Sequence, residues 1–179
     1  MQEISLNVLD LAQNSVSAKA TLIEIEINED PDSDSLTVRI SDNGCGMTKE
    51  QLKAVADPFY TTRNTRKVGL GVPLFKMAAE MTGGSFSITS EVGLGTTTKG
   101  VFGLTHIDRM PLGNINETIL TLIYCNPTID FVYTRTFSGK SFTLDTREVR
   151  SVLGDVPLTE KDVTAWMRGY LDEGDKTLR

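Results

Sequence analysis

The sequence predicts an α+β fold in which helices cover a β-sheet, giving a two-layer α/β sandwich. Three observations support this prediction. Apolar residues recur at helical spacing from about residue 4 to 18 and again from 72 to 81. Between these segments, and after the second, apolar and polar residues alternate as they do in half-buried strands. The chain has 179 residues, 39% of them hydrophobic, which is enough to bury a substantial core.

The first predicted helix runs from about Ile4 to Ala18. Its core-facing stripe consists of Ile4, Val8, Leu11 and Ala12. Beside that stripe, Asp10 and Asn14 stand one helical turn apart and point the same way. Polar residues in such a stripe usually form a solvated face. Asp and Asn are mediocre helix formers, however, so placing two of them in mid-helix carries a small cost.

Two strands follow, and the second leads into a carboxylate. Ile23, Ile25 and Ile27 alternate with polar residues, and a second alternation of apolar and polar residues covers 36–41. Counting by twos from Ile40, Asp42 points toward the core. A carboxylate there needs a hydrogen-bond donor, and an adenine amino group would be one. The glycines at 44 and 46 leave room for a flat ring to approach the backbone. Alone, Asp-x-Gly is also an ordinary turn, so both interpretations stand.

The middle of the chain combines helices, an irregular segment and a second pair of strands. Thr48 and Gln51 form a capping-box pattern, which predicts a short helix. Residues 57–63 break the periodicity. Next, Gly69-Leu70-Gly71 precedes a helix over 72–81, whose expected buried stripe is Leu74, Phe75, Ala78 and Met81. A helix N-terminus behind glycines offers backbone donors and a positive dipole end, which suits an anion. Strands over 85–90 and 96–104 are expected next.

From about residue 105 the chain changes character, and we expect a C-terminal extension of α-β-β-α type over residues 105–179. Its predicted elements are a helix over 114–124, a hairpin turning near 138–139, a short helix from 145 and a last helix over 159–171. More than half of the aromatic residues lie here. Such a segment is expected to pack on the main sheet or on another subunit, which predicts a protein partner or a homodimer.

Charge and residue content exclude several functions. The net charge of −6 argues against nucleic-acid binding, because sequence-independent binding needs clustered Lys and Arg. No apolar run is long enough to cross a membrane and no signal peptide is visible, so we expect no membrane partner and a cytoplasmic protein. One histidine and two cysteines cannot supply an ordinary zinc site without carboxylates.

Four segments carry chemistry and follow one another in order. They are the helix with Asp10 and Asn14, the turn Asp42-x-Gly-x-Gly, the segment Asp57-Pro-Phe-Tyr-Thr-Thr-Arg63, and Gly69-Leu-Gly71 with a later Gly95-Thr96. Their order and spacing resemble the N, G1, F and G2 boxes of the GHKL (Bergerat-fold) ATPases. Gyrase, the large heat-shock chaperone, histidine kinases and mismatch-repair ATPases share this superfamily. The resemblance covers about residues 4–103. It implies an ATP-binding domain over 1–104, with a mixed, mostly antiparallel sheet covered by helices on one face.

The resemblance also implies a role for each matching residue. Asp42 would hold the adenine amino group, and Asn14 would bind the Mg²⁺ that bridges the phosphates. The other implied nucleotide-binding residues are Gly44, Gly46 and Met47 around the adenine, Thr96 beneath it, Phe59, Thr61, Thr62 and Arg63 at the border of the lid, and Gly69, Leu70 and Gly71 at the phosphates. ATP and Mg²⁺ are therefore the expected cofactors.

Within this superfamily the sequence is most similar to the histidine-kinase type of ATP-binding domain. The segments Gly69-Leu-Gly-Val-Pro-Leu-Phe-Lys76, Thr82-Gly-Gly84 and Gly93-Leu-Gly-Thr96 carry that similarity. The full length resembles small stand-alone bacterial ATP-binding proteins. One departure concerns Asp10, which stands where hydrolytic members have a glutamate that activates water. A carboxylate one methylene shorter puts efficient hydrolysis in doubt.

A second departure concerns the phosphoacceptor, because no phosphoacceptor helix precedes the first box in this sequence. His106 is the sole histidine. Residues 106–112 partly match the phosphoacceptor box of histidine kinases, but Ile107 stands where an acid should follow the histidine. A structural role for His106 is therefore favoured over a role as phosphoacceptor.

The residues and the resemblance together predict an ATP-dependent signalling kinase or a kinase-like regulator of a partner protein. One alternative is a non-catalytic, ATP-sensing regulatory subunit. Another is a slow ATPase that drives a conformational cycle, with Asp10 as its general base.

Overall fold

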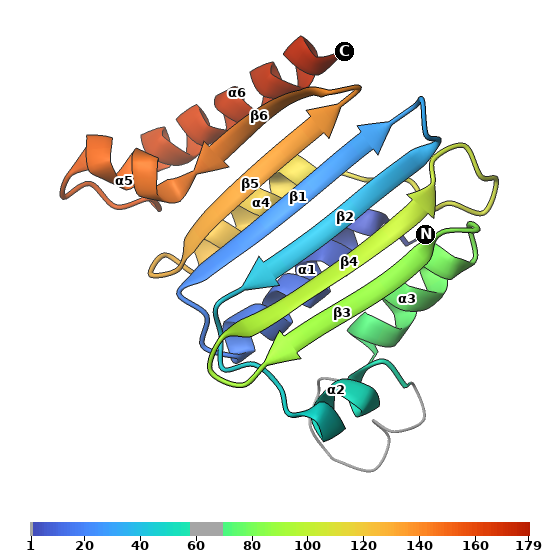
Figure 1. The fold of residues 1–179 in the computed structure, drawn as a ribbon. Coiled ribbons are helices and arrows are strands. Elements are labelled where there is room, and N and C mark those ends of the chain that lie inside the picture. The colour runs from blue at the N-terminus through green and yellow to red at the C-terminus, as the bar shows by residue number, and fades with distance from the viewer. Residues whose placement is uncertain (1, 58–69) are drawn as a thin grey trace.

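The computed structural model describes residues 2–57 and 70–179 (Figure 1). Its elements are α1 (Ile4–Ser17), β1 (Leu22–Asp30), β2 (Ser35–Asp42), α2 (Lys49–Val55), α3 (Gly71–Glu80), β3 (Ser85–Glu91), β4 (Gly95–Gly103), α4 (Ile115–Cys125), β5 (Asp130–Phe137), β6 (Lys140–Asp145), α5 (Thr146–Leu153) and α6 (Lys161–Leu178). Within the described ranges, no helix is long and apolar enough to span a bilayer.

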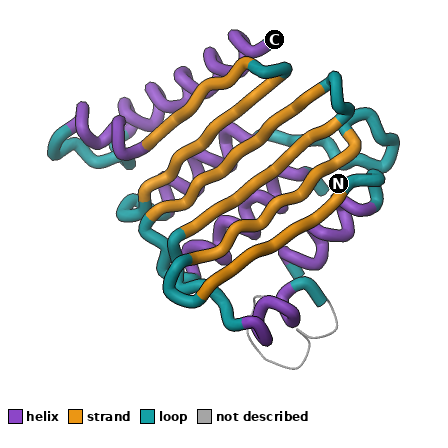
Figure 2. Tube along the Cα trace, in the orientation of Figure 1, coloured by secondary structure: helices purple, strands orange, loops and turns teal. Residues whose placement is uncertain are grey.

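The strands form one mixed sheet in the order β3-β4-β2-β1-β5-β6. β1 and β5 run parallel, and the other neighbouring pairs are antiparallel. The helices α1, α3, α4 and α6 lie on one face of this sheet, as Figures 1 and 2 show. The predicted fold class, a two-layer α+β sandwich with a mostly antiparallel sheet covered on one face, is confirmed.

The core lies between the two layers because the central strands alternate buried and exposed residues. The buried residues of β1 and β2 are Ile23, Ile25, Ile27, Leu36, Val38 and Ile40. The other face of the sheet is polar and carries the ion pair between Glu26 and Arg39, with 2.9 Å between Oε1 and Nη1. Period-two alternation therefore fixes which side of each strand meets the helices. It also brings Asp42, the last residue of β2, to the helix side.

Residues after 104 continue the same sheet. β5 pairs with β1 in register from Leu22–Asp130 to Glu29–Phe137, although the two strands lie far apart in the sequence. The helix, hairpin and short helix expected in the C-terminal extension are present as α4, β5–β6 and α5. The last helix, α6, packs on α4 and on the outer strands.

α6 is longer than the sequence indicated, because it ends at Leu178 and not near residue 171. Glycines at 169 and 174 weaken the helical signal in this segment. Packing explains the glycine at 174, since a Cβ there would lie 2.7 Å from the ring of Phe142 on β6. Leu178, in the last turn, is only 5% exposed. Burial of this turn outweighs the low helix propensity of glycine.

The buried face of α3 also differs from the predicted stripe. Phe75 is buried as expected, but Leu74 and Met81 are 38% and 57% exposed. Phe75 packs edge-on against Phe86 and Phe102, with ring centroids 6.2 and 5.5 Å away. These aromatic residues of the sheet select the face of α3 that is buried, and helical periodicity alone allowed more than one face.

Candidate functional site

Asp42 ends β2 on the side of the sheet that α1 covers. Its Oδ2 accepts a hydrogen bond from the Ser15 hydroxyl at 2.6 Å, and its Oδ1 accepts one from the Gly44 N–H at 2.8 Å. The residue is half-buried. An ionised carboxylate offers about four acceptor positions, so two donors leave part of its capacity unused. Asp42 is therefore held in place and can still accept a hydrogen bond from a ligand.

The turn that follows β2 is held between α1 and the β3–β4 hairpin. The Cys45 N–H donates to the Ala18 carbonyl at 2.9 Å, and the Gly93 N–H donates to the Cys45 carbonyl at 2.8 Å. Gly46 has a φ of +70°, and a Cβ there would overlap the carbonyl oxygen of Glu91. Two backbones meet so closely that only glycine fits. Gly46 thus allows the turn to pack directly against the hairpin.

Ser90 on β3 joins this turn to the hairpin. Its hydroxyl accepts the Met47 N–H at 2.8 Å, donates to the Gly95 carbonyl at 3.1 Å and lies 2.7 Å from the Thr96 hydroxyl. Thr96 stands directly opposite Asp42 in the pairing of β2 with β4. The sheet therefore brings Met47 and Thr96 to the same end of β2 as the carboxylate.

Asp10 and Asn14 lie on the side of α1 that meets the start of α3. A Cβ at Gly71 would lie 3.5 Å from the Cβ of Asp10, so the first turn of α3 packs on this part of α1. The N-terminus of α3 has no side-chain cap. Its first N–H groups and the positive end of its dipole are thus available to an anion. Asp10, with Asn14 one helical turn further along α1, therefore lies beside a helix end that is suited to an anion.

The oxygens of Asp10 and Asn14 are of the kind that Mg²⁺ prefers. Within the described part of the chain, neither side chain takes part in a hydrogen bond or an ion pair. The described residues contain no group of three His, Cys, Asp or Glu side chains that could hold a metal without further ligands. The donor set therefore fits a magnesium ion that takes most of its ligands from phosphates and water and the rest from Asn14, alone or with Asp10.

Five residues of the predicted site lie outside the described residues, namely Phe59, Thr61, Thr62, Arg63 and Gly69. Leu70, which is 56% exposed, precedes α3 directly. The other three of the four sequence segments, which contain Asn14, Asp42 and Gly71, meet at one end of the sheet.

The capping box predicted for α2 is present, with Thr48 and Gln51 each bonded to the backbone of the other.

His106 lies toward the other end of the sheet. It follows Gly103, which pairs with Ser35 at the start of β2, whereas Asp42 ends that strand. The strand length between these two pairings corresponds to about 23 Å. Nδ1 of His106 accepts the Asp108 N–H at 3.1 Å, so in the neutral ring the proton lies on Nε2. The structure does not bring His106 together with the other predicted site residues.

Two residues that contact the site, Ser15 and Ser90, were not predicted from the sequence. Ser15 is 3% exposed and follows Leu11 by four residues, so it belongs to the buried stripe of α1. A hydroxyl on a buried apolar stripe needs a partner, and that signal could have identified Ser15. Ser90 carried no such signal, because its contacts depend on how the hairpin and the turn pack together.

Comparison with known proteins agrees with the resemblance seen in the sequence. Residues 1–106 match the family described as "Histidine kinase-, DNA gyrase B-, and HSP90-like ATPase". Sensor protein SrrB of Staphylococcus aureus is 34% identical over 102 residues, which cover 54% of this chain and 17% of that protein. The "Non-motile and phage-resistance protein" of Caulobacter vibrioides is 30% identical over 115 residues, covering 61% of this chain and 14% of that protein. The chain spans about a sixth of the length of such relatives.

A solved structure supports the fold. The Aquifex aeolicus MutL ATPase domain complexed with ADP has a TM-score of 0.50 to this chain, with 16% sequence identity, and covers 94% of this chain and 87% of its own. At this identity the likeness concerns the fold alone. The family match covers more than half of the chain and includes α1, the turn after β2, and the β3–β4 hairpin. The chain therefore belongs to the histidine kinase-, DNA gyrase B- and HSP90-like (GHKL) ATPases and carries an ATP-binding domain homologous to those of sensor proteins.

Proposed function

We propose that the chain binds Mg-ATP beside Asp42 and acts as a signalling kinase or a kinase-like regulator of a partner protein. The observation that carries this proposal is the meeting of three segments, each with a different binding group. Asp42 would accept a hydrogen bond from the adenine amino group, above Thr96. Asn14 would hold Mg²⁺, and the uncapped start of α3 would bind phosphate oxygens.

The rest of the nucleotide would be bound by backbone groups. Gly44, Gly46 and Met47 would border the adenine, and Leu70 and Gly71 would face the phosphates. Phe59, Thr61, Thr62, Arg63 and Gly69 would complete the site from the segment between α2 and α3. Phosphoryl transfer in such a site would depend on positioning and on neutralising the phosphate charge, since the protein has little covalent chemistry to perform.

We infer that the phosphoryl acceptor belongs to another molecule. The separation of about 23 Å between the two ends of the sheet argues against transfer from a nucleotide at Asp42 to His106 of the same chain. Transfer to His106 would need a second copy, as in a homodimer. We assign nucleotide binding to residues 1–104 and contact with the partner to the extension, residues 105–179, with both working in the cytoplasm.

A slow ATPase is the second candidate, because Asp10 stands beside Gly71 at the phosphate end of the site. Its carboxylate would take a proton from the attacking water. The shorter side chain of Asp, compared with Glu, predicts slow turnover. If no transfer occurs either, the same site would serve as an ATP sensor that regulates a partner without chemistry.

Incubation of the chain with Mg²⁺ and ATP labelled at the γ-phosphate, alone and with a candidate partner protein, separates these functions. Stable label on a protein supports the kinase, free labelled phosphate supports the ATPase, and binding without either product supports the sensor. Asp42→Asn is the control, since it should abolish binding and all products together. Absence of ATP binding by the unaltered chain would contradict every form of the proposal.

A further inference from the structure

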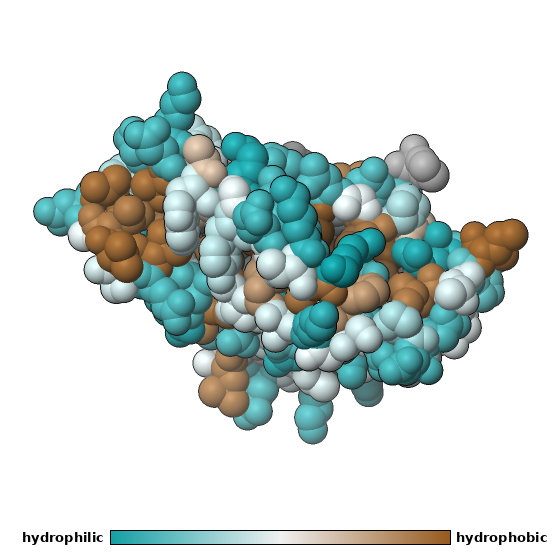
Figure 3. Space-filling model, turned by 90° about the horizontal axis from the view of Figure 1, so that it is seen from above, coloured by the Kyte–Doolittle hydropathy of each residue, from teal (hydrophilic) through white to brown (hydrophobic). Residues whose placement is uncertain are grey.

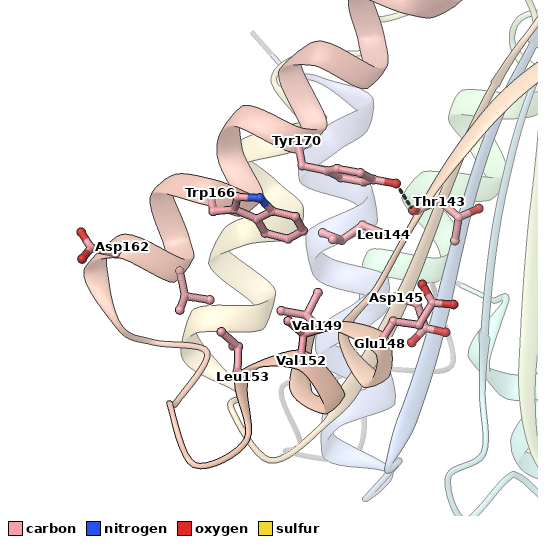
Figure 4. A pocket seen from close by; sticks show the side chains of 11 residues that line it. Thr143, Leu144, Asp145, Glu148, Val149, Val152, Leu153, Asp162, Trp166 and Tyr170 are labelled. Carbon is pink, nitrogen blue, oxygen red and sulfur yellow. Dashed lines mark hydrogen bonds between the residues drawn. The ribbon is translucent and has the colours of Figure 1, made fainter.

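A hollow of about 510 Å³ lies between α5, α6 and β6, the outermost strand of the sheet. Its walls are mostly apolar and include Leu144, Val149, Val152, Leu153, Trp166 and Tyr170. In Figure 4 these side chains converge on one space. Figure 3 shows apolar side chains gathered at the end of the molecule where α5 and the start of α6 lie. The volume falls within the usual range for binding sites.

Part of the apolar lining of this hollow is open to solvent, and its two aromatic rings are held in place. Trp166 is 55% exposed and Val152 is 87% exposed. Trp166 stacks on Tyr170 with ring centroids 5.5 Å apart, and the Tyr170 hydroxyl donates to the Thr143 carbonyl at 2.7 Å. Covering these two rings would remove apolar area from water with little further loss of their side-chain entropy. Such a surface is suited to a partner.

The charged side chains that line the hollow in the described chain are all acidic, namely Asp145, Glu148 and Asp162. Figure 4 shows Asp162 at one end and the other two carboxylates at the opposite end, with the apolar wall between them. Arg147 pairs with Asp145 through both carboxylate oxygens, so within the described residues Glu148 and Asp162 supply the charge that remains uncompensated in the hollow. The surface is complementary to an apolar segment that carries basic residues on both sides.

The edge of β6 favours a helix over a strand as the docked segment. A strand would add to the backbone groups of this edge strand, but the Thr143 carbonyl already accepts a hydrogen bond from the Tyr170 hydroxyl, which competes with a ladder bond there. A second copy of this chain is disfavoured as well. A two-fold contact through this hollow would bring each acidic rim against its own copy, and like charges would repel.

We propose that the hollow docks an amphipathic basic helix of the partner protein, with its apolar side chains against Trp166 and Val149. This inference rests on the proposed action on a partner and specifies where and how that partner binds. The apolar face would lie between α5 and α6, and Lys or Arg residues at either end would face Glu148 and Asp162. This mode is the docking of an amphipathic helix into a groove.

Fluorescence of Trp166, the sole tryptophan of the chain, reports directly on this site. The probe is a 20-residue helical peptide, free of tryptophan, with leucine on one face and lysine elsewhere, and its twin carries glutamate in place of lysine. The lysine peptide should shift Trp166 emission to shorter wavelength and saturate. The glutamate twin should bind at least about tenfold more weakly, and the preference should shrink as salt is raised.

Matched variants test the charge argument. Glu148→Lys with Asp162→Lys should weaken the lysine peptide about tenfold or more. Asp32→Lys with Glu80→Lys, the same charge change at exposed positions away from the hollow, should leave its binding within about twofold. Equal binding of both peptides, no shift with the lysine peptide at about 1 mM, or a shift produced by raising the protein concentration alone would overturn the proposal. ATP binding is measured separately on the same preparation, so failure of either proposal is recognised independently.

Discussion

The Ser15 hydroxyl donates to the Asp42 carboxylate at 2.6 Å. This hydrogen bond joins the last turn of α1 to the end of β2, a central strand. Ser15→Ala would leave one carboxylate oxygen without its protein donor. Hydrogen bonds to charged groups are worth about 1.5–3 kcal/mol. We expect a loss of about 1–2 kcal/mol in the free energy of unfolding, measured with urea, and several-fold weaker ATP binding by calorimetry. An unchanged ATP affinity would show that Ser15 does not position Asp42.

Asp42 and Asn14 should affect nucleotide binding in different ways. Asp42→Asn keeps the size of the side chain but replaces one acceptor oxygen by a donor, so it should abolish adenine-nucleotide binding with and without magnesium. Asn14→Ala should weaken Mg-ATP binding at least about tenfold and leave the much weaker magnesium-free binding nearly unchanged. Titrations with ATP, in the presence of Mg²⁺ or of a chelator, distinguish the two outcomes. If Asn14→Ala weakens both titrations equally, Asn14 is not the magnesium ligand.

The close approach at Gly46 can be tested against a glycine in open space. Gly46 and Gly93 both have positive φ, but a Cβ at Gly93 meets nothing within 4 Å. Gly93→Ala should cost about 1 kcal/mol in the free energy of unfolding, from backbone strain alone. Gly46→Ala should cost about 1–3 kcal/mol more, because the Cβ overlaps the Glu91 carbonyl. Equal costs would mean that the turn moves away from the hairpin freely.

The buried ion pair between Arg135 and Glu29 connects β5 to β1. Arg135 is 3% exposed, and its side chain also faces Asp175 at 3.7 Å. Glu29→Gln would leave the guanidinium poorly compensated, and breaking a buried pair costs about 3–5 kcal/mol. Glu26→Gln on the same strand removes an exposed pair and should cost at most about 1 kcal/mol. Thermal unfolding of the parent chain should be a single transition, since residues 1–104 and 105–179 share one sheet. Two separate transitions would show that these two parts unfold independently and would contradict the prediction.

The lowered pKa of Asp145 predicts that the stability of the fold depends on pH. Hydrogen bonds from Arg147 lower the pKa of Asp145 in the folded chain, so the unfolded chain binds the proton more readily. The resulting stabilisation is present above the ordinary carboxyl pKa of about 4 and is lost as the pH falls through the lowered folded value. Asp145→Asn keeps a cap acceptor for the Arg147 N–H but should be less stable than the parent by at most about 1 kcal/mol at neutral pH. The difference should shrink as the pH falls below about 4, and a pH-independent difference would contradict the assignment.

Local signals in the sequence account for most of the elements. Alternation over Ile23, Ile25 and Ile27 predicted β1, and the capping box at Thr48 predicted the start of α2. Such signals can be read from a single sequence because each depends on neighbours within one turn or one strand. The order of the four motifs, from Asp10 to Thr96, then indicated the family, which the match over residues 1–106 confirms.

The tertiary structure decided what depends on contacts between distant segments. The pairing of β5 with β1, the Ser15–Asp42 hydrogen bond and the position of His106 at the opposite end of the sheet all join residues far apart in the sequence. Periodicity narrows which faces of an element can be buried but does not show which neighbours cover them, and the misplaced stripe of α3 illustrates this. The sequence by itself determined most of the elements, the apolar faces of the strands and of α1, and the family. Only packing of the whole chain determined which polar groups meet, because those contacts follow from the arrangement that buries the most apolar surface.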